Sequence, residues 1–534
     1  MLHKLLSVLR QFKRYKLSDV ERDLFKEIRQ FWESGKERSV LPRNSDAAVQ
    51  VIVEGFVECP ASIMDKARMA KAVQEVTGEE AVVLVRGMTK SSSRVVPFYR
   101  AFGINDFVLW WRNYLNPFVV IPAAWLAFKL ILSVRSGEKL VEYCYKGIHV
   151  GDLMYDTLIR FRPNSYTVDK LEFRKHFRLL LRAFYIFINN ERVINKYQPN
   201  WLITSHNVYA EFGLLARQMN NRENASVLLK DIDVYKFYGP ETKIKEHFLK
   251  VKESDLEHVM NDEDFYEEAL KYLEERFSGK VDQIDVINAY RDKKEYSFED
   301  LKELYPDLNP SCKNVFVMSH AFSDAPHVGE GLLFKDYYQF LLETLIYLNS
   351  VPNINCFVKP HPSSYMWGER GGVEQIVEEY SLSYIRILPS DLNTNCIKEL
   401  ADCIVTGQGT AGLEFSCFGI PAITAGKGYY SGFDIALEPR SKEEYFEWLE
   451  NASKLPPLNM LTKRKAVCML YYISKNKYHS DLLPKKHIFP GDDLEGLYKI
   501  RVSEIKDSIE SGGLIRDVFY SRVVNDVLLF VNKV

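Results

Sequence analysis

Two short stretches, Val358-Lys-Pro-His-Pro362 and Thr406-Gly-Gln-Gly-Thr-Ala-Gly-Leu-Glu414, indicate a parallel α/β fold. Each follows an apolar run that is typical of a buried strand, Asn355–Val358 before the first and Cys403–Val405 before the second. Ligands of parallel α/β sheets bind where such strands end. The second stretch is also a glycine-rich loop that opens a short helix, where backbone N–H groups suit an anion. We therefore predict a phosphate-binding site at these two loops.

Side chains in the two stretches supply groups that suit the phosphate of a nucleotide-sugar. Thr410 adds a hydroxyl beside Gly409, and His361 lies between two prolines that restrict the backbone and hold the imidazole in one direction. Lys359 could screen phosphate charge, although a surface lysine is the simpler interpretation. Glu414 has two interpretations, a carboxylate that satisfies the helix start and one that binds ribose hydroxyls. We predict donor binding by these groups without a metal.

The glycine-rich loop has alternative interpretations. Gly407–Gly412 matches the Gly-x-Gly-x-x-Gly pattern of dinucleotide sites, but these require a full-length helix and then a strand that ends in an acidic residue. Pro421 arrives nine residues after the last glycine, and the next strand ends at Ala425-Gly-Lys427 without a carboxylate. The chain contains no Gly-x-x-x-x-Gly-Lys-Ser/Thr phosphate loop. A tight strand-to-helix turn without a ligand remains the structural alternative.

A second candidate loop carries His320, Asp324 and His327 after another strand-like run. Histidine and carboxylate side chains can ligate a metal, but no further ligand is spaced to complete a site. We favour a cleft loop that contacts the donor through His320 and Asp324 or closes two domains. No metal site and no cofactor are expected, apart from the nucleotide-sugar as co-substrate.

These residues resemble motifs of known bacterial transferases. Lys359-Pro-His-Pro-Ser363 with Gly409-Thr410 resembles the His-Pro and Ser/Thr motifs of bacterial sialyltransferases and of transferases that use CMP-linked 3-deoxy-octulosonic acid (Kdo). The longer pattern, from Ser319–His327 to Gly407–Pro421, is similar to the surface and capsular polysaccharide biosynthesis family. The resemblance is specific over about residues 311–450. It implies a GT-B glycosyltransferase fold, two Rossmann-like domains that face a cleft, and leaves the donor sugar open.

The order of apolar and charged segments predicts four regions. Ala48–Val53 and Glu80–Val85 read as the first strands of one α/β domain, and Asn314–Met318 as the first strand of another. The charged run Asp262–Arg276 is interpreted as a solvated helix face. The resemblance suggests that C-terminal helices cross back to the first domain. The predicted regions are an N-terminal acceptor-side α/β domain (1–240), a helical interdomain connection (241–310), a nucleotide-sugar-binding α/β domain (311–450) and C-terminal helices (451–534).

The first domain offers candidates for the base that an inverting transferase needs to deprotonate its acceptor. Asp152 and Asp156 follow the strand-like Ile148–Val150, and His206 follows Trp201–Thr204. We prefer His206 because an imidazole titrates near neutral pH. Each residue also has a structural or acceptor-positioning interpretation. A Ser-nucleophile hydrolase is not indicated at this strand end, because no Gly-x-Ser-x-Gly elbow is present.

The composition limits the class of protein. At 534 residues the chain suggests more than one domain, and 46% hydrophobic residues are enough for large cores. A net charge of −2 argues against a nucleic-acid binder. The eight cysteines are scattered without metal-ligand spacing, which is typical of a reduced, cytoplasmic protein.

Two segments raise the question of a membrane. Residues 2–16 have leucines on one helical face among basic residues, so they suit either an anionic membrane surface or packing as a terminal helix. Phe118–Val134 is strongly apolar but short for a spanning helix, and it contains Pro122 and Lys129. We expect a helix that is buried or that dips into the interface rather than one that spans the bilayer.

The combined prediction is a cytoplasmic glycosyltransferase of surface polysaccharide biosynthesis, peripheral on the inner membrane. Its expected partners are a nucleotide-sugar donor, a glycan or lipid-linked acceptor and the inner-leaflet membrane surface, but no nucleic acid. The donor is expected to be CMP-linked and Kdo-like. Two alternatives stay open: a CDP-polyol phosphotransferase, and a non-catalytic assembly or export partner that keeps the fold.

Overall fold

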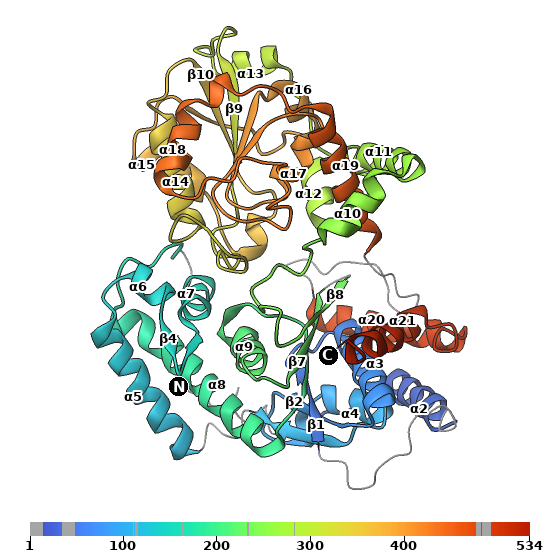
Figure 1. The fold of residues 1–534 in the computed structure, drawn as a ribbon. Helices are drawn as coiled ribbons and strands as arrows, with labels where there is room; N and C mark the ends of the chain where they lie inside the picture. Colours follow the sequence, from blue (N-terminus) through green and yellow to red (C-terminus); the bar gives the residue numbers. More distant parts are fainter. Residues whose placement is uncertain are drawn as a thin grey trace.

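The computed structural model describes residues 14–34, 49–110, 112, 116–162, 165–231, 234–281, 283–476, 482 and 493–533. Two α/β halves lie one above the other in Figure 1, each built around its own sheet. The prediction of an α/β protein with two parallel-sheet domains is confirmed.

The first sheet has six strands in the order β3-β2-β1-β6-β7-β8, and all pairs are parallel except β7 with β8. Side chains of β1 such as Val51, Ile52 and Val53 are fully buried, as expected for a strand that helices cover on both faces. The strands are β1 (Val49–Gly55), β2 (Glu80–Val85), β3 (Asp106–Leu109), β6 (Trp201–Thr204), β7 (Ser226–Asp231) and β8 (Val234–Tyr238).

The second sheet has five strands in the order β11-β10-β9-β12-β13, and every pair is parallel. Its central strands are also buried, from Val315 to Val317 in β9 and at Ile404 and Val405 in β12. The strands are β9 (Lys313–Met318), β10 (Ile354–Lys359), β11 (Ile385–Ile387), β12 (Cys403–Thr406) and β13 (Ala422–Thr424).

Both sheets reverse their strand order once. The chain builds outward from β1 to β3 and then returns to place β6 on the other side of β1. In the second sheet it builds from β9 to β11 and then places β12 on the other side of β9. Ligands of open α/β sheets bind at the carboxyl ends of the strands that flank such a reversal. The two positions to inspect are therefore the ends of β1 and β6 and the ends of β9 and β12.

Helices cover both faces of the first sheet (Figure 1). Helix α3 starts at Pro60, where a missing N–H costs nothing, and ends at Gly78, whose φ of 73° is favourable for glycine. The helices of this half are α2 (Asp19–Ser34), α3 (Pro60–Thr77), α4 (Val95–Ala101), α5 (Pro117–Ser133), α6 (Gly137–Val141), α7 (Gly151–Arg160), α8 (Phe173–Tyr197) and α9 (Leu214–Asn220), with a π-helical turn η4 (Tyr209–Gly213), a 3-10 turn η2 (Lys90–Ser92) and a small hairpin of β4 (Cys144–Tyr145) and β5 (Ile148–His149).

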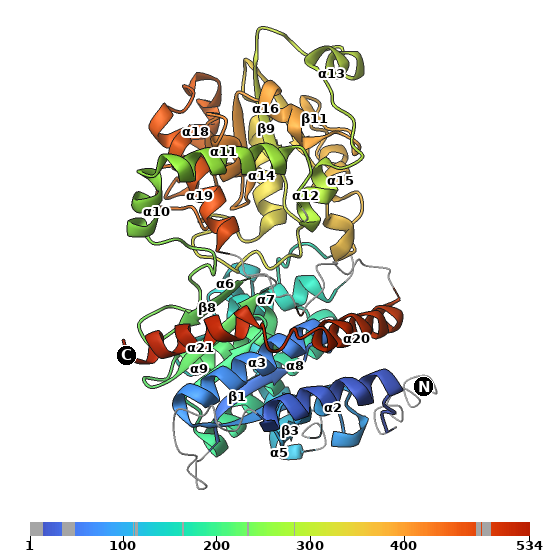
Figure 2. The same cartoon turned by 90° about the vertical axis from the view of Figure 1, so that its right-hand side faces the viewer.

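The segment between the two sheets forms helices that pack on the second half. Leu256 of α10 and Leu273 of α11 belong to the same buried cluster as Phe316 of β9 and Val467 of α19. Figure 2 shows α10, α11 and α12 beside the second sheet. The helices of this half are α10 (Glu253–Met260), α11 (Glu263–Phe277), α12 (Ile284–Tyr290), α13 (Phe298–Leu304), α14 (Tyr337–Leu348), α15 (Gly372–Glu379), α16 (Ile397–Leu400), α17 (Ala411–Ser416), α18 (Lys442–Glu450) and α19 (Met460–Lys475), with 3-10 turns η5 (Ser364–Trp367), η6 (Thr394–Cys396) and η7 (Ala452–Lys454).

The last two helices, α20 (Leu494–Glu510) and α21 (Val518–Val531), pack on α2 and α3 of the first half (Figure 2). Arg68 of α3 is fully buried and forms an ion pair with Asp517 at 2.7 Å. Tyr498 of α20 donates a hydrogen bond to Glu21 at 3.0 Å. The core of the first half is thus completed by the end of the chain.

Of the two segments that suggested membrane contact, only the apolar one lies within the described residues. Residues 2–13 of the basic N-terminal pattern lie outside the described residues, and Arg14 to Lys16 are not helical. The apolar segment forms α5, which is neither buried all round nor spanning: one face packs on the protein and the other is exposed. In the described ranges of the chain, no helix combines the length and apolarity that crossing a membrane requires.

Candidate functional site

The carboxyl edge of the second sheet brings the predicted motifs together. Strand β9 lies between β10 and β12, so His320 after β9 sits between the His361 loop and the glycine-rich loop. The His320 ring stacks on Tyr337 at 4.0 Å, and its Nε2 accepts a hydrogen bond from the backbone N–H of Gln408 at 3.2 Å. Burial, with His361 nearby, lowers the pKa of His320 to about 3, so the ring is neutral and supports the loop as an acceptor.

The glycines of the loop allow side chains to approach its backbone. A Cβ atom on Gly407 would lie 2.9 Å from Nε2 of His320, and one on Gly409 would lie 3.1 Å from that ring. A Cβ atom on Gly412 would lie 2.1 Å from the hydroxyl oxygen of Tyr430, which donates to the Gly409 carbonyl at 2.8 Å. The three glycines of the Gly-x-Gly-x-x-Gly pattern are therefore needed so that His320 and Tyr430 can pack against the backbone of this tight turn.

Thr410 is half-buried at the start of α17, and its hydroxyl makes no capping bond to the helix. The hydroxyl interacts with Tyr429. Helix α17 is only six residues long. A ligand here would therefore bind to individual backbone amides and to this hydroxyl, and not to the dipole of a long helix.

His361 is half-buried, and its Nδ1 accepts a hydrogen bond from the Ser363 N–H at 3.2 Å. This bond turns the imidazole and places any ring proton of the neutral form on Nε2. The interpretation of Lys359 as a surface lysine is wrong: it is 7% exposed, and its Nζ donates to the Leu392 carbonyl at 3.3 Å. Burial, with Lys293 nearby, lowers the pKa of Lys359 to about 8.

Glu414 forms an ion pair with Arg276, which neither the helix-start nor the ribose-binding interpretation of this residue includes. Its Oε1 accepts from Nε of Arg276 at 2.9 Å and also from Nη2 of the same side chain, and both residues are buried. The solvated-face interpretation of the charged run is wrong for Arg276. Arg276 falls in helical register with the buried Ala269 and Leu273, so this pattern was the available signal.

The loop after β9 connects the two halves of the molecule. His327 Nδ1 lies 2.6 Å from Oδ1 of Asp156 on α7, and Ser323 accepts a hydrogen bond through its carbonyl from Tyr209 at 3.1 Å. Burial raises the pKa of Asp156, and Asp156 outweighs burial to raise the pKa of His327. With His320 turned to the glycine loop, His327 turned to Asp156 and Asp324 exposed, these three residues do not form a shared metal site.

Asp152, the neighbour of Asp156 one turn earlier on α7, is enclosed by cations. Its carboxylate accepts from Arg217, with Nη2 at 2.8 Å, and pairs with Lys245 Nζ at 2.6 Å. Burial opposes ionisation, but the two cations outweigh it and hold the pKa of Asp152 below its ordinary range. A carboxylate held in this way is a weak base. Asp152 therefore has the geometry of a positioning residue, beside a small pocket that Asp156, His327, Arg217 and Lys245 help to line.

The strand reversal of the first sheet holds His206 next to a buried carboxylate. Glu54, at the end of β1, accepts from Lys66 Nζ at 2.8 Å and from the Ser205 hydroxyl at 2.6 Å. His206 lies two residues after the end of β6 and packs edge-on against Phe212, with the ring centroids 5.2 Å apart. Burial lowers the pKa of His206, although Asp231 and Glu54 oppose this, so the imidazole is neutral near pH 7.

Sequence reasoning missed Glu54, Lys66 and Arg276 and did not pair His327 with Asp156. A carboxylate that ends an apolar strand was the signal for Glu54. Nothing in the sequence marks a contact between residues 171 positions apart, as in the Asp156–His327 pair.

No protein-family model matches this chain, and no curated protein matches its sequence. Among solved structures it is similar to the KpsC β-Kdo 2,7 transferase of Thermosulfurimonas dismutans, with 14% identity, a TM-score of 0.32 and coverage of 60% of this chain and 94% of that chain. It is also similar to a glycosyltransferase of Rickettsia africae, with 11% identity, a TM-score of 0.26 and coverage of 87% and 99%.

A UDP-GlcNAc 2-epimerase of Neisseria meningitidis bound to UDP-GlcNAc has 8% identity, a TM-score of 0.24 and coverage of 80% of this chain and 100% of that chain. At these identities and TM-scores the likenesses carry no argument about activity. What the chain itself displays is a pair of parallel-sheet α/β domains with their strand reversals occupied by polar side chains.

Proposed function

We propose that this protein is a glycosyltransferase that moves a sugar from a nucleotide donor to a glycan or lipid-linked acceptor of a surface polysaccharide. The observation that carries the proposal is the meeting of the His361 loop, His320 and the 407–410 loop at the strand reversal of the second sheet. This is the position where open α/β sheets bind nucleotides. The resemblance of the same motifs to Kdo transferases supports a CMP-linked, Kdo-like donor.

The second half would bind the donor. His361, with Nδ1 already satisfied by Ser363, has Nε2 in the correct protonation state to donate to a phosphate oxygen. The backbone amides of Gly409 and Thr410 and the hydroxyl of Thr410 would add donors. Lys359, which is buried, would supply positive charge from beneath the site. Such preorganised donors stabilise charge on the leaving phosphate more in the transition state than in the ground state. Glu414, fixed by Arg276, is available to accept from ribose hydroxyls.

The first half would present the acceptor. His206 is our proposed base because it is neutral and stands at the strand reversal of the first sheet. Asp152 is a positioning residue because Arg217 and Lys245 hold it ionised. Asp156 would act through His327, so that acceptor binding and domain contact are linked.

Product analysis tests this function directly. The purified chain would be incubated with CMP-, CDP- and UDP-sugars and with CDP-glycerol or CDP-ribitol, and the products of a mixed glycan acceptor identified by mass spectrometry. Transfer of a sugar supports the proposal. Transfer of a polyol phosphate would replace it with the phosphotransferase alternative. Nucleotide binding without any product, in the presence of native membranes as acceptor source, would favour the non-catalytic assembly partner.

A further inference from the structure

Helix α5 has two apolar faces, and only one of them packs on the protein. Val119, Ala123, Ala127 and Leu130 recur every three or four residues and are buried in the core of the first half. The helix packs along α8 at the periphery of the molecule (Figure 1). Packing against the core therefore accounts for the apolar residues of the buried face, but not for those of the outward face.

The outward face of α5 is built from large apolar side chains. Phe118 is 80% exposed, Ile121 67%, Trp125 62% and Leu132 62%. Phe128 extends this face toward α8, because it lies 6.3 Å from the half-exposed Phe173. A contiguous exposed patch of this type is typical of an interaction site. We call these five α5 residues the α5 face.

The α5 face has little charge. The helix contains no acidic residue and one basic residue, Lys129, which is exposed. Its 17 residues extend about 26 Å at 1.5 Å per residue, which is short of a bilayer core. Such a helix suits a position in the plane of a membrane interface better than a path across it.

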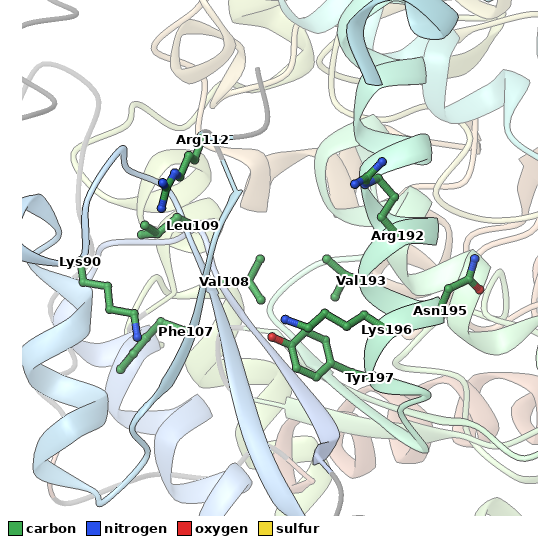
Figure 3. Close-up of a pocket in the computed structure, with 10 residues that line it drawn as sticks. All are labelled: Lys90, Phe107, Val108, Leu109, Arg112, Arg192, Val193, Asn195, Lys196 and Tyr197. Atoms are coloured by element: carbon green, nitrogen blue, oxygen red, sulfur yellow. The ribbon is translucent and has the colours of Figure 1, made fainter. Parts of the chain in front are cut away.

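A basic pocket lies beside the last turns of α8, the helix on which α5 packs. This cavity of about 640 Å³ lies between strand β3 and the last turns of α8. Figure 3 shows Arg112 on one side of it and Arg192 on the other. Arg112 precedes the first residue of α5 by five positions. The ten lining residues include no carboxylate and four bases, namely Lys90, Arg112, Arg192 and Lys196.

The charges of this pocket are not used by ion pairs in the described part of the chain. There, Lys196 lies over the ring of Tyr197 at 4.7 Å and Lys90 over Phe107 at 5.5 Å, while Arg112 and Arg192 pair with no carboxylate. Lys196 stands in the last turn of α8, where a base also offsets the helix dipole. Lys90 of η2, Arg112 and Arg192 have no such reason to gather.

We infer that the α5 face and the basic pocket form one docking surface for an anionic phospholipid bilayer. The α5 face enters the interfacial layer, and the pocket receives the phosphate of a lipid head group. Charge decides the occupant: a phosphate lies next to acyl chains in a lipid layer, which matches a basic pocket next to an acid-free apolar helix. The surface belongs to the half that we propose to hold the acceptor, but the inference does not depend on catalysis.

Vesicle co-sedimentation of the full chain tests the surface. The probes are phosphatidylcholine vesicles with and without phosphatidylglycerol. Wild type should bind the anionic vesicles more tightly, and Phe118→Ser/Ile121→Ser/Trp125→Ser should bind them roughly tenfold or more weakly. Arg192→Gln/Lys196→Gln should weaken only the anionic binding, by about fivefold per residue. The matched controls are Met460→Ser/Leu461→Ser, which removes exposed apolar residues of α19, and Lys271→Gln/Lys302→Gln, which removes exposed bases of α11 and α13.

A second measurement covers the case in which the triple variant fails to fold. Brominated anionic lipid should quench part of the tryptophan fluorescence of wild type, and Trp125→Phe, which keeps an aromatic ring, should lose that part. Unchanged quenching in Trp125→Phe, or equal binding of the pocket variant and wild type to anionic vesicles, overturns the inference. So does an α5 face variant that binds vesicles normally but loses self-association, which would assign the face to a second copy of this chain. Donor binding, measured without vesicles, should be the same in all these variants.

Discussion

His327 of the second half and Asp156 of the first half face each other across the domain boundary, with Nδ1 and Oδ1 2.6 Å apart and both side chains almost fully buried. The contact joins the loop after β9 to α7, the helix that also carries Asp152. It makes the relation between the two halves sensitive to protonation.

We expect this pair to make stability fall as pH rises above neutrality. Asp156 raises the pKa of His327, and burial raises the pKa of Asp156. The raised pKa of His327 sets the pH range: its stabilisation is fully present below the unfolded pKa of histidine, about 6.5, and is lost as pH rises through the folded pKa. The raised pKa of Asp156 acts in the same direction but from the lower unfolded pKa of aspartate, about 3.9. Urea unfolding across this range should show a shallower loss in His327→Gln than in wild type. The control is His258→Gln on the exposed side of α10, and identical pH profiles for His327→Gln and wild type would contradict the pair's role.

The proposed donor site predicts weaker nucleotide binding on loss of single hydrogen-bonding groups. His361→Ala and Thr410→Ala should each cost about 1.5–3 kcal/mol of binding free energy, because each removes a bond to a charged phosphate. Calorimetric titration with the nucleotide of the active donor measures this, and His258→Ala is a matched histidine control. Wild-type affinity and kcat/KM in both variants would remove the phosphate from this edge of the sheet.

The proposed acceptor site predicts a separation of turnover from donor affinity. His206→Ala should lower kcat strongly and leave the donor Kd near the wild-type value, because His206 lies in the other half from the donor loops. Asp152→Asn should act mainly on acceptor KM, since Arg217 and Lys245 already hold that carboxylate. If Asp156→Asn loses turnover while His206→Ala retains it, the base is Asp156 with His327.

Variants of Glu414 can distinguish a structural role of this residue from a role in ligand binding. Glu414→Gln leaves the buried Arg276 without its counter-charge, so we expect a loss of about 3–5 kcal/mol in the free energy of unfolding. Arg276→Met/Glu414→Gln should recover much of that stability. Donor affinity of the double variant, measured by calorimetry, then reports on ribose: unchanged affinity assigns Glu414 to the fold alone.

The strands and the polar loops at their carboxyl ends could be predicted from the sequence because their signals are local. Apolar runs such as Cys403–Val405 show a strand that is buried on both faces, and glycines or a histidine directly after the run show where the chain turns at its carboxyl end. The sequence does not show in which direction the side chain of a residue after a strand points. The sequence predicts that the His320 loop contacts the donor or closes the domains, but it does not predict that the His320 ring packs beneath the glycine loop.

The contacts that give the site its electrostatics join distant positions, so no local pattern announces them. Arg276 and Glu414 are 138 positions apart, and Arg68 and Asp517 are 449 apart. Lys359 was misjudged for the same reason: whether a lysine at a strand end is buried depends on the loop that covers it, here through Leu392.

The packing of α20 and α21 on α2 and α3 also imposes an order on synthesis. The ribosome releases β1 to β8 first, but the partner of the buried Arg68 emerges 449 residues later. Before that point the face of α3 that meets α21 is uncovered, and the Arg68 guanidinium lacks one of its two carboxylates.

Limited proteolysis of ribosome-bound chains halted before Leu494 should therefore cut within α3, whereas the full chain resists. Protection of α3 in the halted chain would contradict this. The first domain to be translated is thus expected to be the last to mature, which makes late truncations damaging to the beginning of the protein rather than to its end.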